Sequence, residues 1–262
     1  MKLFRLYAIL LVGFGGVLTS CEKTFDSKFA TQSDLSNSSV VQVYMAMVNA
    51  SRNYVYVNAK PVTGALMSSG SVFPTTGYGF NVPGGLHAFL VRDTSSTTTQ
   101  ATLSFSENLQ ASKNYTIFIY DTITSPKQKT VNTNIVVPSD TTARLRFANF
   151  VYNPSALPTG FDIFSVKRNA VIFSNVRETE VTEFIPFAAA VTDTFYIRPT
   201  GSGTNLQNRT VSGTPPVTSY SNIQAILTPT RKRSYTLVFR GSWRNDLNGS
   251  STVRALSIFA NY

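Results

Sequence analysis

The feature that most constrains the fold of this chain is a series of short runs rich in β-branched and aromatic residues. Each run has the length of a β-strand, and Gly, Pro, Asn, Asp and Ser, which favour turns, lie between the runs. Only residues 177–191 have a composition that fits one or two helical turns. The pattern predicts an all-β protein, with strands near residues 41–48, 54–57, 87–91, 101–105, 115–120, 143–150, 160–166, 194–199, 235–239 and 254–260.

One of these runs, ARLRF at residues 143–147, alternates between apolar and basic side chains. Leu145 and Phe147 lie on one face of such a strand, and Arg144 and Arg146 lie on the other. We therefore expect a strand that is buried on one face and solvated on the other.

The two halves of the chain resemble each other. Residues 47–58 match residues 147–164, which aligns Asn49 with Asn149, and a second match aligns Tyr115 with Tyr235. The offset grows from 100 to 120 residues between these pairs, so the second copy carries an insertion, for which 199–221 is the best candidate. Its Pro, Gly and Ser content predicts a mobile surface segment.

A repeat of this size suits sandwich domains rather than a solenoid. We expect two tandem immunoglobulin-like β-sandwiches, one in residues 41–140 and one in residues 141–262.

The N-terminus has the pattern of an export signal. Lys2 and Arg5 precede residues 6–18, an uncharged apolar run that is short for a membrane-spanning helix, which needs about 20 residues. The sequence LTSC follows at residues 18–21 and contains the only cysteine, Cys21. LTSC resembles the lipobox of bacterial lipoproteins, in which the cysteine takes a diacylglyceryl group, the peptide is cut before it, and the new amine is acylated. The alternatives are an ordinary secretory signal with an unrelated cysteine and a single-pass anchor.

The resemblance implies a lipoprotein signal peptide at 1–20 and a lipidated N-terminus with a polar tether at 21–40. Acyl chains on Cys21 would hold the protein on the cell envelope, at the outer membrane, with its periplasmic or surface face left open. A mature chain with a lipidated Cys21 has no free thiol, which excludes disulfides, cysteine-bound metals and thiol nucleophiles.

Several short motifs together resemble the domain of unknown function 4397 family. They are Val-Asn-Ala-Ser at 48–51, Val-Tyr-Val at 55–57, Gly-Gly-Leu-His at 84–87 and Tyr-Thr-Ile at 115–117, with weaker echoes at 147–150 and 235–237. The resemblance covers most of residues 41–262. It implies an exported β-sandwich protein, often a lipoprotein, and it implies no active site.

Few residues could support catalysis. His87 is the only histidine, and its alternating apolar surroundings favour a structural, hydrogen-bonded role over that of a catalytic base. Glu178, Glu180 and Glu183 could form a paired-carboxylate site, but a solvated strand face explains them better. The sequence therefore predicts no enzyme, no catalytic or metal site and no cofactor.

The charge is the remaining clue to partners. The chain carries +10, and removing Lys2 and Arg5 leaves 21 basic against 13 acidic residues, or +8. The densest basic run is residues 231–233, with Arg240, Arg244 and Arg254 near it in sequence. Such a surface attracts anionic headgroups or acidic glycans, although a merely soluble basic surface is the plainer interpretation. The expected export of the chain and its lack of a recognition motif argue against nucleic acid as a partner.

Aromatic residues allow for sugar stacking at Trp243 and in the tyrosine-containing segments 54–57 and 77–80, although most rings are needed to fill the cores. We expect a membrane-anchored, non-catalytic binding or adhesion module, with ligand contacts on loops at the ends of the sandwiches. The alternative is a scaffold subunit of an envelope assembly, or an accessory glycan-binding protein of an uptake system.

Overall fold

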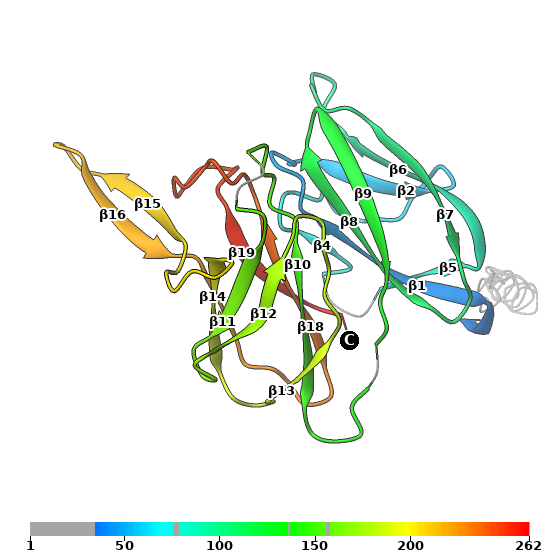
Figure 1. Cartoon of the computed structure of the whole chain (residues 1–262). Coiled ribbons are helices and arrows are strands. Elements are labelled where there is room, and N and C mark those ends of the chain that lie inside the picture. Colours follow the sequence, from blue (N-terminus) through cyan, green and yellow to red (C-terminus); the bar gives the residue numbers. More distant parts are fainter. Residues whose placement is uncertain (1–34, 76–78, 136, 156–157, 262) are drawn as a thin grey trace, which may run out of the picture. The chain divides into compact units, whose positions relative to one another are not determined.

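The computed structural model describes residues 35–75, 79–135, 137–155 and 158–261. These ranges contain nineteen strands and one short 3-10 helix, η1 (Leu35–Asn37). The all-β prediction is confirmed, and residues 177–191 form no helix (Figure 1). Within the described ranges, no helix has the length and hydropathy that crossing a membrane requires. The expected signal peptide, Cys21 and most of the expected tether lie outside the described residues, and β1 begins at Ser38, within that tether.

The first half forms two sheets that face each other. The first inner sheet has the order β4-β1-β8-β9, with β5 also pairing with β1, and the first outer sheet has the order β3-β2-β6-β7. Val43, Ile117, Val55 and Phe89 belong to the core between them. The strands are β1 (Ser38–Met45), β2 (Asn53–Val57), β3 (Lys60–Pro61), β4 (Val72–Phe73), β5 (Phe80–Pro83), β6 (Gly85–Asp93), β7 (Leu103–Leu109), β8 (Asn114–Thr122) and β9 (Ser125–Asn132).

The second half repeats this arrangement. The second inner sheet has the order β13-β10-β18-β19, and the second outer sheet has the order β12-β11-β14-β17. Phe147, Leu237, Ile163 and Phe195 belong to its core. The strands are β10 (Ala143–Asn149), β11 (Phe161–Ser165), β12 (Ala170–Val176), β13 (Ile185–Phe187), β14 (Asp193–Pro199), β15 (Gln207–Ser212), β16 (Val217–Asn222), β17 (Gln224–Leu227), β18 (Ser234–Arg240) and β19 (Ala255–Ala260).

The strand register confirms one predicted match between the halves. β1 pairs in parallel with β8 and β10 with β18, which places Val41 beside Tyr115 and Leu145 beside Tyr235. Each tyrosine hydroxyl accepts a hydrogen bond from the backbone N–H five residues earlier, at 3.1 Å from Gln110 and 3.0 Å from Thr230. Tyr115 and Tyr235 therefore occupy equivalent places.

The predicted match of Asn49 with Asn149 is wrong. The N–H of Val48 donates to the carbonyl of Asp121, and the N–H of Tyr152 donates to the carbonyl of Gly241. Those acceptors are equivalent in the two halves, so Asn49 corresponds to Asn153. The error arises because a single shared asparagine fixes an alignment less firmly than a ladder of backbone hydrogen bonds does.

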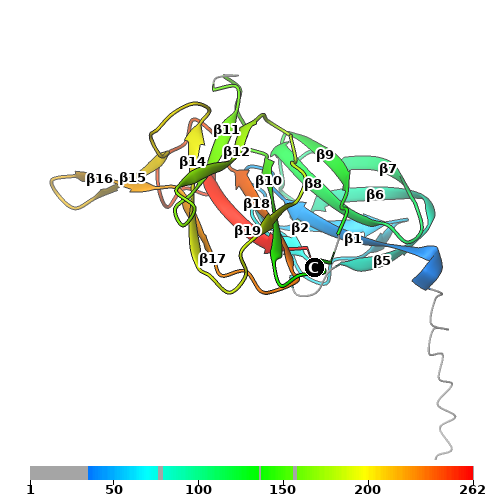
Figure 2. The same cartoon turned by 60° about the horizontal axis from the view of Figure 1, so that its bottom comes forward.

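The insertion lies where the sequence places it. β6 and β7 pair through Phe89 and Phe105, whereas β14 and β17 pair through Phe195 and Ala225, which lie much further apart in the chain. The extra residues form an antiparallel hairpin of β15 and β16, which projects from the second sandwich in both views (Figures 1 and 2). Its surface position is confirmed, since Val217 to Ser221 are exposed. It is a hydrogen-bonded ribbon, however, rather than an irregular loop.

A third cluster joins the two inner sheets back to back. Tyr44 and Phe118 of the first half pack there against Phe150, Val238 and Phe259 of the second. Both inner sheets are therefore buried on both faces, which explains their nearly continuous apolar runs. Residues 35–262 accordingly form one compact unit. That residues 41–140 and residues 141–262 fold independently of each other stays a prediction.

The expectation of a solvated face on the 143–147 strand is wrong at one position. Arg146 is only 2% exposed, because its side chain lies between the inner sheets. It donates to the hydroxyls of Thr236, Thr116 and Thr133 at 2.9, 3.2 and 3.3 Å.

Candidate functional site

His87 has the structural role that its sequence context favours. It is buried on β6, with Nδ1 2.9 Å from the amide nitrogen of Asn58 and Nε2 2.7 Å from the carbonyl oxygen of Pro83. Because both ring nitrogens are engaged, the ring links β6 to the end of β5 and to the turn between β2 and β3. Cys21, the expected lipid-attachment residue, lies outside the described residues.

The three glutamates near residue 180 do not converge on one site. The carboxylate of Glu180 accepts a hydrogen bond from the backbone N–H of Arg177 at 2.8 Å. Glu178 and Glu183 line two different clefts. Within the part of the chain that the structure describes, no three His, Cys, Asp or Glu side chains group as a metal site would require.

The basic residues that lie near one another in sequence have separate roles. Arg240 bonds to Ser257 at the interface between the inner sheets, and Arg244 bonds to Ser155. Arg254 bonds to Asn208 at the base of the hairpin and lies 4.8 Å from the ring centre of Trp243. Trp243 packs against the second core. Its indole therefore supports the fold rather than presenting an open stacking surface.

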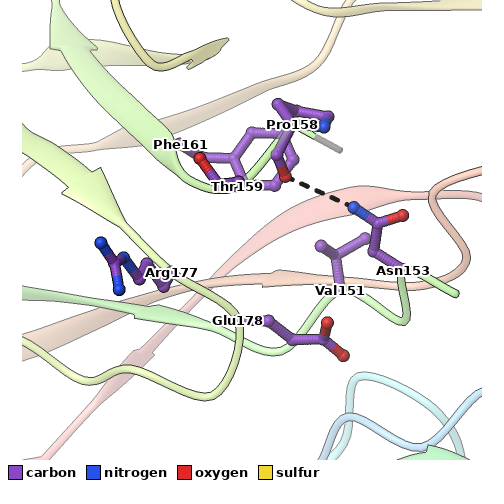
Figure 3. Close-up of a pocket in the computed structure, with 7 residues that line it drawn as sticks. All are labelled: Val151, Asn153, Pro158, Thr159, Phe161, Arg177 and Glu178. Carbon is purple, nitrogen blue, oxygen red and sulfur yellow. Dashed lines mark hydrogen bonds between the residues drawn. The ribbon is translucent and has the colours of Figure 1, made fainter. Parts of the chain in front are cut away.

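A cleft of about 400 Å³ opens at one end of the second sandwich (Figure 3). Its apolar wall is formed by Val151, Pro158 and Phe161, and its polar rim includes Asn153, Thr159, Arg177 and Glu178. The Asn153 amide donates to the carbonyl of Pro158 at 3.5 Å and its oxygen accepts from the N–H of Ser155 at 3.2 Å. These bonds hold Asn153, Ser155 and Pro158 together at the rim, and ligand contacts on loops at the ends of the sandwiches stay a prediction.

The electrostatics of this cleft suit binding more than catalysis. Partial burial raises the pKa of Glu178, and Asp121 of the first sandwich adds to this rise, while the N–H of Asn153 and the cation of Lys127 oppose it. Arg177 and Glu178 point in opposite directions (Figure 3). The two charges therefore cannot act together on one group in the cleft, which resembles a small apolar slot with a polar rim.

A second candidate surface is the open face of the first outer sheet. One row of side chains crosses its four strands, and consists of Pro61, Tyr56, Leu90 and Ser104. The guanidinium of Arg92 lies 4.9 Å from the centre of the Tyr56 ring and donates to the Tyr56 hydroxyl at 3.2 Å. Beside the row, the small side chains of Ala88, Ser104 and Ser106 leave a shallow hollow of about 380 Å³.

The second outer sheet has the same arrangement at equivalent positions. Its row consists of Val171, Phe164, Tyr196 and Gln224. The guanidinium of Arg198 lies 3.7 Å from the centre of the Phe164 ring and bonds to Asn205 at 2.7 Å. Arg92 and Arg198 correspond because each follows the equivalent core residues, Phe89 and Phe195, by three positions.

The sequence pattern did not predict these two rows. Tyr56 falls in one of the tyrosine-containing segments noted there, but the row exists only through pairing of four strands. The alternation of β2 does indicate that Tyr54 and Tyr56 face away from the core. Nothing in the local sequence shows that Arg92 or Leu90 lies beside them.

No protein-family model matches this chain, and no curated protein sequence matches it. The resemblance to the domain of unknown function 4397 family therefore stays a prediction. Among solved structures, the chain is similar to a carbohydrate-binding module of family CBM26 from Eubacterium rectale Amy13K in complex with maltoheptaose. The identity is 9%, the TM-score is 0.25, and the match covers 85% of this chain and 96% of that chain. So low a TM-score supports no statement about ligand or function.

Proposed function

We propose that this chain is a non-catalytic binding module, anchored in the cell envelope through Cys21, that binds carbohydrate on its two outer sheets. The anchor rests on the N-terminal sequence. The carbohydrate specificity rests on one observation, which is the recurrence of a partly exposed aromatic–arginine row at equivalent positions of both sandwiches.

The chemistry of the rows suits a sugar chain. A partly exposed aromatic ring offers a flat apolar surface to the C–H face of a sugar, and a guanidinium beside it donates to hydroxyl or carboxylate oxygens. On the first face, the hollow next to Leu90 adds a shallow recess of about 380 Å³. Such a surface recognises an extended chain rather than an enclosed small molecule.

Stability alone does not require these rows. A cation–π pair at an exposed site contributes only about 0.5–1 kcal/mol, so a sandwich loses little without it. The two halves have diverged in sequence, yet both keep an arginine above an aromatic ring at the same place. Binding on both faces explains this better than folding does.

The test compares polysaccharide binding by the soluble chain, residues 35–262, with that of Tyr56→Ala, Phe164→Ala and the double variant. A glycan array identifies the ligand, and affinity electrophoresis measures retardation. We expect each single variant to weaken retardation several-fold and the double variant to abolish it, because two sites on one chain bind with avidity.

The matched control is Tyr220→Ala, which removes an exposed tyrosine from the hairpin, outside both rows. It should leave retardation unchanged, and all four variants should melt close to the unmodified protein. Unchanged retardation in the double variant would refute the proposed carbohydrate surface.

One observation supports the scaffold function as a second candidate. Val217 and Tyr220, both 64% exposed, lie on the projecting β15–β16 hairpin, where they have no role in either core. A pull-down from detergent-solubilised envelopes, with and without the hairpin tip, tests this candidate. Stoichiometric recovery of one protein that depends on the tip would favour the scaffold.

A further inference from the structure

A polar cleft of about 540 Å³ lies where the two sandwiches meet. Its walls include Asn114, Asn132 and Asn134 from the end of the first inner sheet, with Lys113 beside them. Glu183 reaches it from the second sandwich, just before β13. The volume is that of a site for a small ligand.

The side chains of this cleft are available for binding. Within the described ranges, the side chains of Lys113, Asn114, Asn132, Asn134 and Glu183 form no hydrogen bond or ion pair with the protein. Three amides, each able to donate and to accept, are the groups that hydroxyl-rich ligands require.

A buried cation lies directly behind the cleft. Thr133 lines it, and the hydroxyl of Thr133 accepts a hydrogen bond from Arg146 at 3.3 Å. Arg146 forms no salt bridge with any described carboxylate, and its hydrogen bonds to described residues come from Nε and Nη2 alone. Its guanidinium also lies 4.6 Å from the centre of the Phe184 ring, a contact that compensates the buried charge only in part. Burial lowers the pKa of Arg146 to about 9, while Glu183 acts in the opposite direction. The guanidinium therefore remains a cation at neutral pH, at an energetic cost that a nearby anion would reduce.

The charges around the cleft do not balance. Arg146 and Lys113 supply two positive charges, and Glu183 supplies the negative charge that acts on Arg146. Because Arg146 is buried, solvent screens its charge less than that of the exposed Lys113 and Glu183, which strengthens its field on the Thr133 side of the cleft. A ligand with one negative charge would restore neutrality.

We propose that this cleft binds a sugar acid, a small polyhydroxylated ligand with one carboxylate. The carboxylate lies toward Lys113 and the Thr133 side of the cleft, where the field of Arg146 is strongest, and the hydroxyls bond to the three asparagine amides. The site is separate from the outer-sheet rows, so it does not depend on the carbohydrate surface proposed above.

Calorimetric titration of residues 35–262 with glucuronate tests the proposal, with glucose as the neutral control of the same ring. We expect glucuronate to bind and glucose to bind at least about tenfold more weakly, since only glucuronate pairs with the excess positive charge. Equal binding of the two sugars, or binding of neither, overturns the proposal. A glucuronate-terminated oligosaccharide then shows whether the natural source is a free sugar acid or the end of a chain.

Two cleft variants at exposed residues give opposite expected results. Lys113→Ala removes a positive charge and should weaken glucuronate binding about five- to tenfold, while Glu183→Gln removes the opposing carboxylate and should strengthen it about threefold or more. Lys167→Ala, an exposed lysine of the second sandwich, is the matched control and should have no effect. The double variant Tyr56→Ala/Phe164→Ala should also bind glucuronate normally. If Lys113→Ala and Glu183→Gln both bind like the unmodified chain, the cleft is not the site.

Discussion

The two sandwiches share a register but differ in what they bury at equivalent positions of their inner sheets. Gln42 of β1 and Arg146 of β10 correspond, since each follows the residue paired with Tyr115 or Tyr235. Gln42 donates to the carbonyl of Ala260 at 2.9 Å and accepts from the amide of Asn261 at 3.1 Å. Arg146 instead places a charge among three threonine hydroxyls.

The difference shows that the interface geometry does not require a charge. A neutral amide fills this position in one half and forms hydrogen bonds through both its nitrogen and its oxygen. Burying a guanidinium in the other half costs free energy that the fold could avoid. A functional role for Arg146, such as the anion-binding cleft proposed above, accounts for that cost.

The largest expected effect comes from weakening the contact between the two halves. Phe150 is 1% exposed, and its ring stacks on Phe118 of the first half at 4.4 Å. Phe150→Ala should cost about 3–5 kcal/mol, the usual loss for a buried phenylalanine. We expect scanning calorimetry to show two transitions in place of one, because the halves are then less coupled. A single transition at an unchanged temperature would show that the interface contributes little.

Making the first half resemble the second should have the next largest effect. Gln42→Arg places a second buried cation in the interface without a carboxylate to pair with it, and should cost about 3 kcal/mol. The reverse change, Arg146→Gln, should cost only about 1 kcal/mol, because Thr116 and Thr133 keep the 2.7 Å bond between their hydroxyls. Urea denaturation of both variants measures the asymmetry. Equal losses in the free energy of unfolding would mean that a charge is tolerated no better at position 146 than at position 42.

Removing the hairpin tip makes the second half more like the first. Replacing residues 211–218 by Asn-Gly joins Thr210 and Ser219, which already pair across the hairpin. This should change the free energy of unfolding by less than about 1 kcal/mol, since the residues removed are exposed and belong to neither core, and the new turn keeps the Thr210–Ser219 pair. Deleting residues 203–217 should be more damaging, because Leu206 packs against the core and Asn208 bonds to Arg254. Equal stability of the two deletions would place the whole insertion outside the sandwich.

The smallest expected effect is a pH dependence that comes from Glu178 of the second half. Burial raises the pKa of Glu178 from its ordinary value of 4.5, so the folded chain holds this proton more tightly than the unfolded chain does. Protonated Glu178 therefore favours the fold at low pH, and this contribution is lost as the pH rises from about 4.5 through the folded pKa. Compared with Glu178→Gln, the unmodified chain should lose relative stability over that range. A relative gain in stability would contradict the assigned direction.

Local sequence placed ten of the nineteen described strands, because their apolar alternation reports burial directly. It did not predict β3, β4, β5, β12, β13, β15, β16 and β17. β9 was missed, since Lys127 and Lys129 make it resemble a loop, although it forms the polar edge of the first inner sheet. Arg146 was assigned to a solvated face because alternation distinguishes two faces of a strand and does not reveal what covers each one.

The candidate sites were less predictable for the same reason. The aromatic–arginine rows combine residues from four strands, and the polar cleft combines residues 112–135 with Glu183 of the other half. His87 could be interpreted correctly because its own strand provides the apolar context. Sites formed by pairing and docking leave no comparable local pattern.

The parallel pairing of each half also has a consequence for how the chain acquires its structure. The first inner sheet cannot form until Val41 pairs with Tyr115, and the second cannot form until Leu145 pairs with Tyr235. Such distant pairings make folding slow, because closing a long loop costs conformational entropy before any stabilising contact forms. Because the chain is synthesised from its N-terminus, a sandwich cannot be completed until nearly all of that half has been made. If the N-terminal segment directs export, as we propose, this delay keeps the chain unfolded while it passes through an export channel.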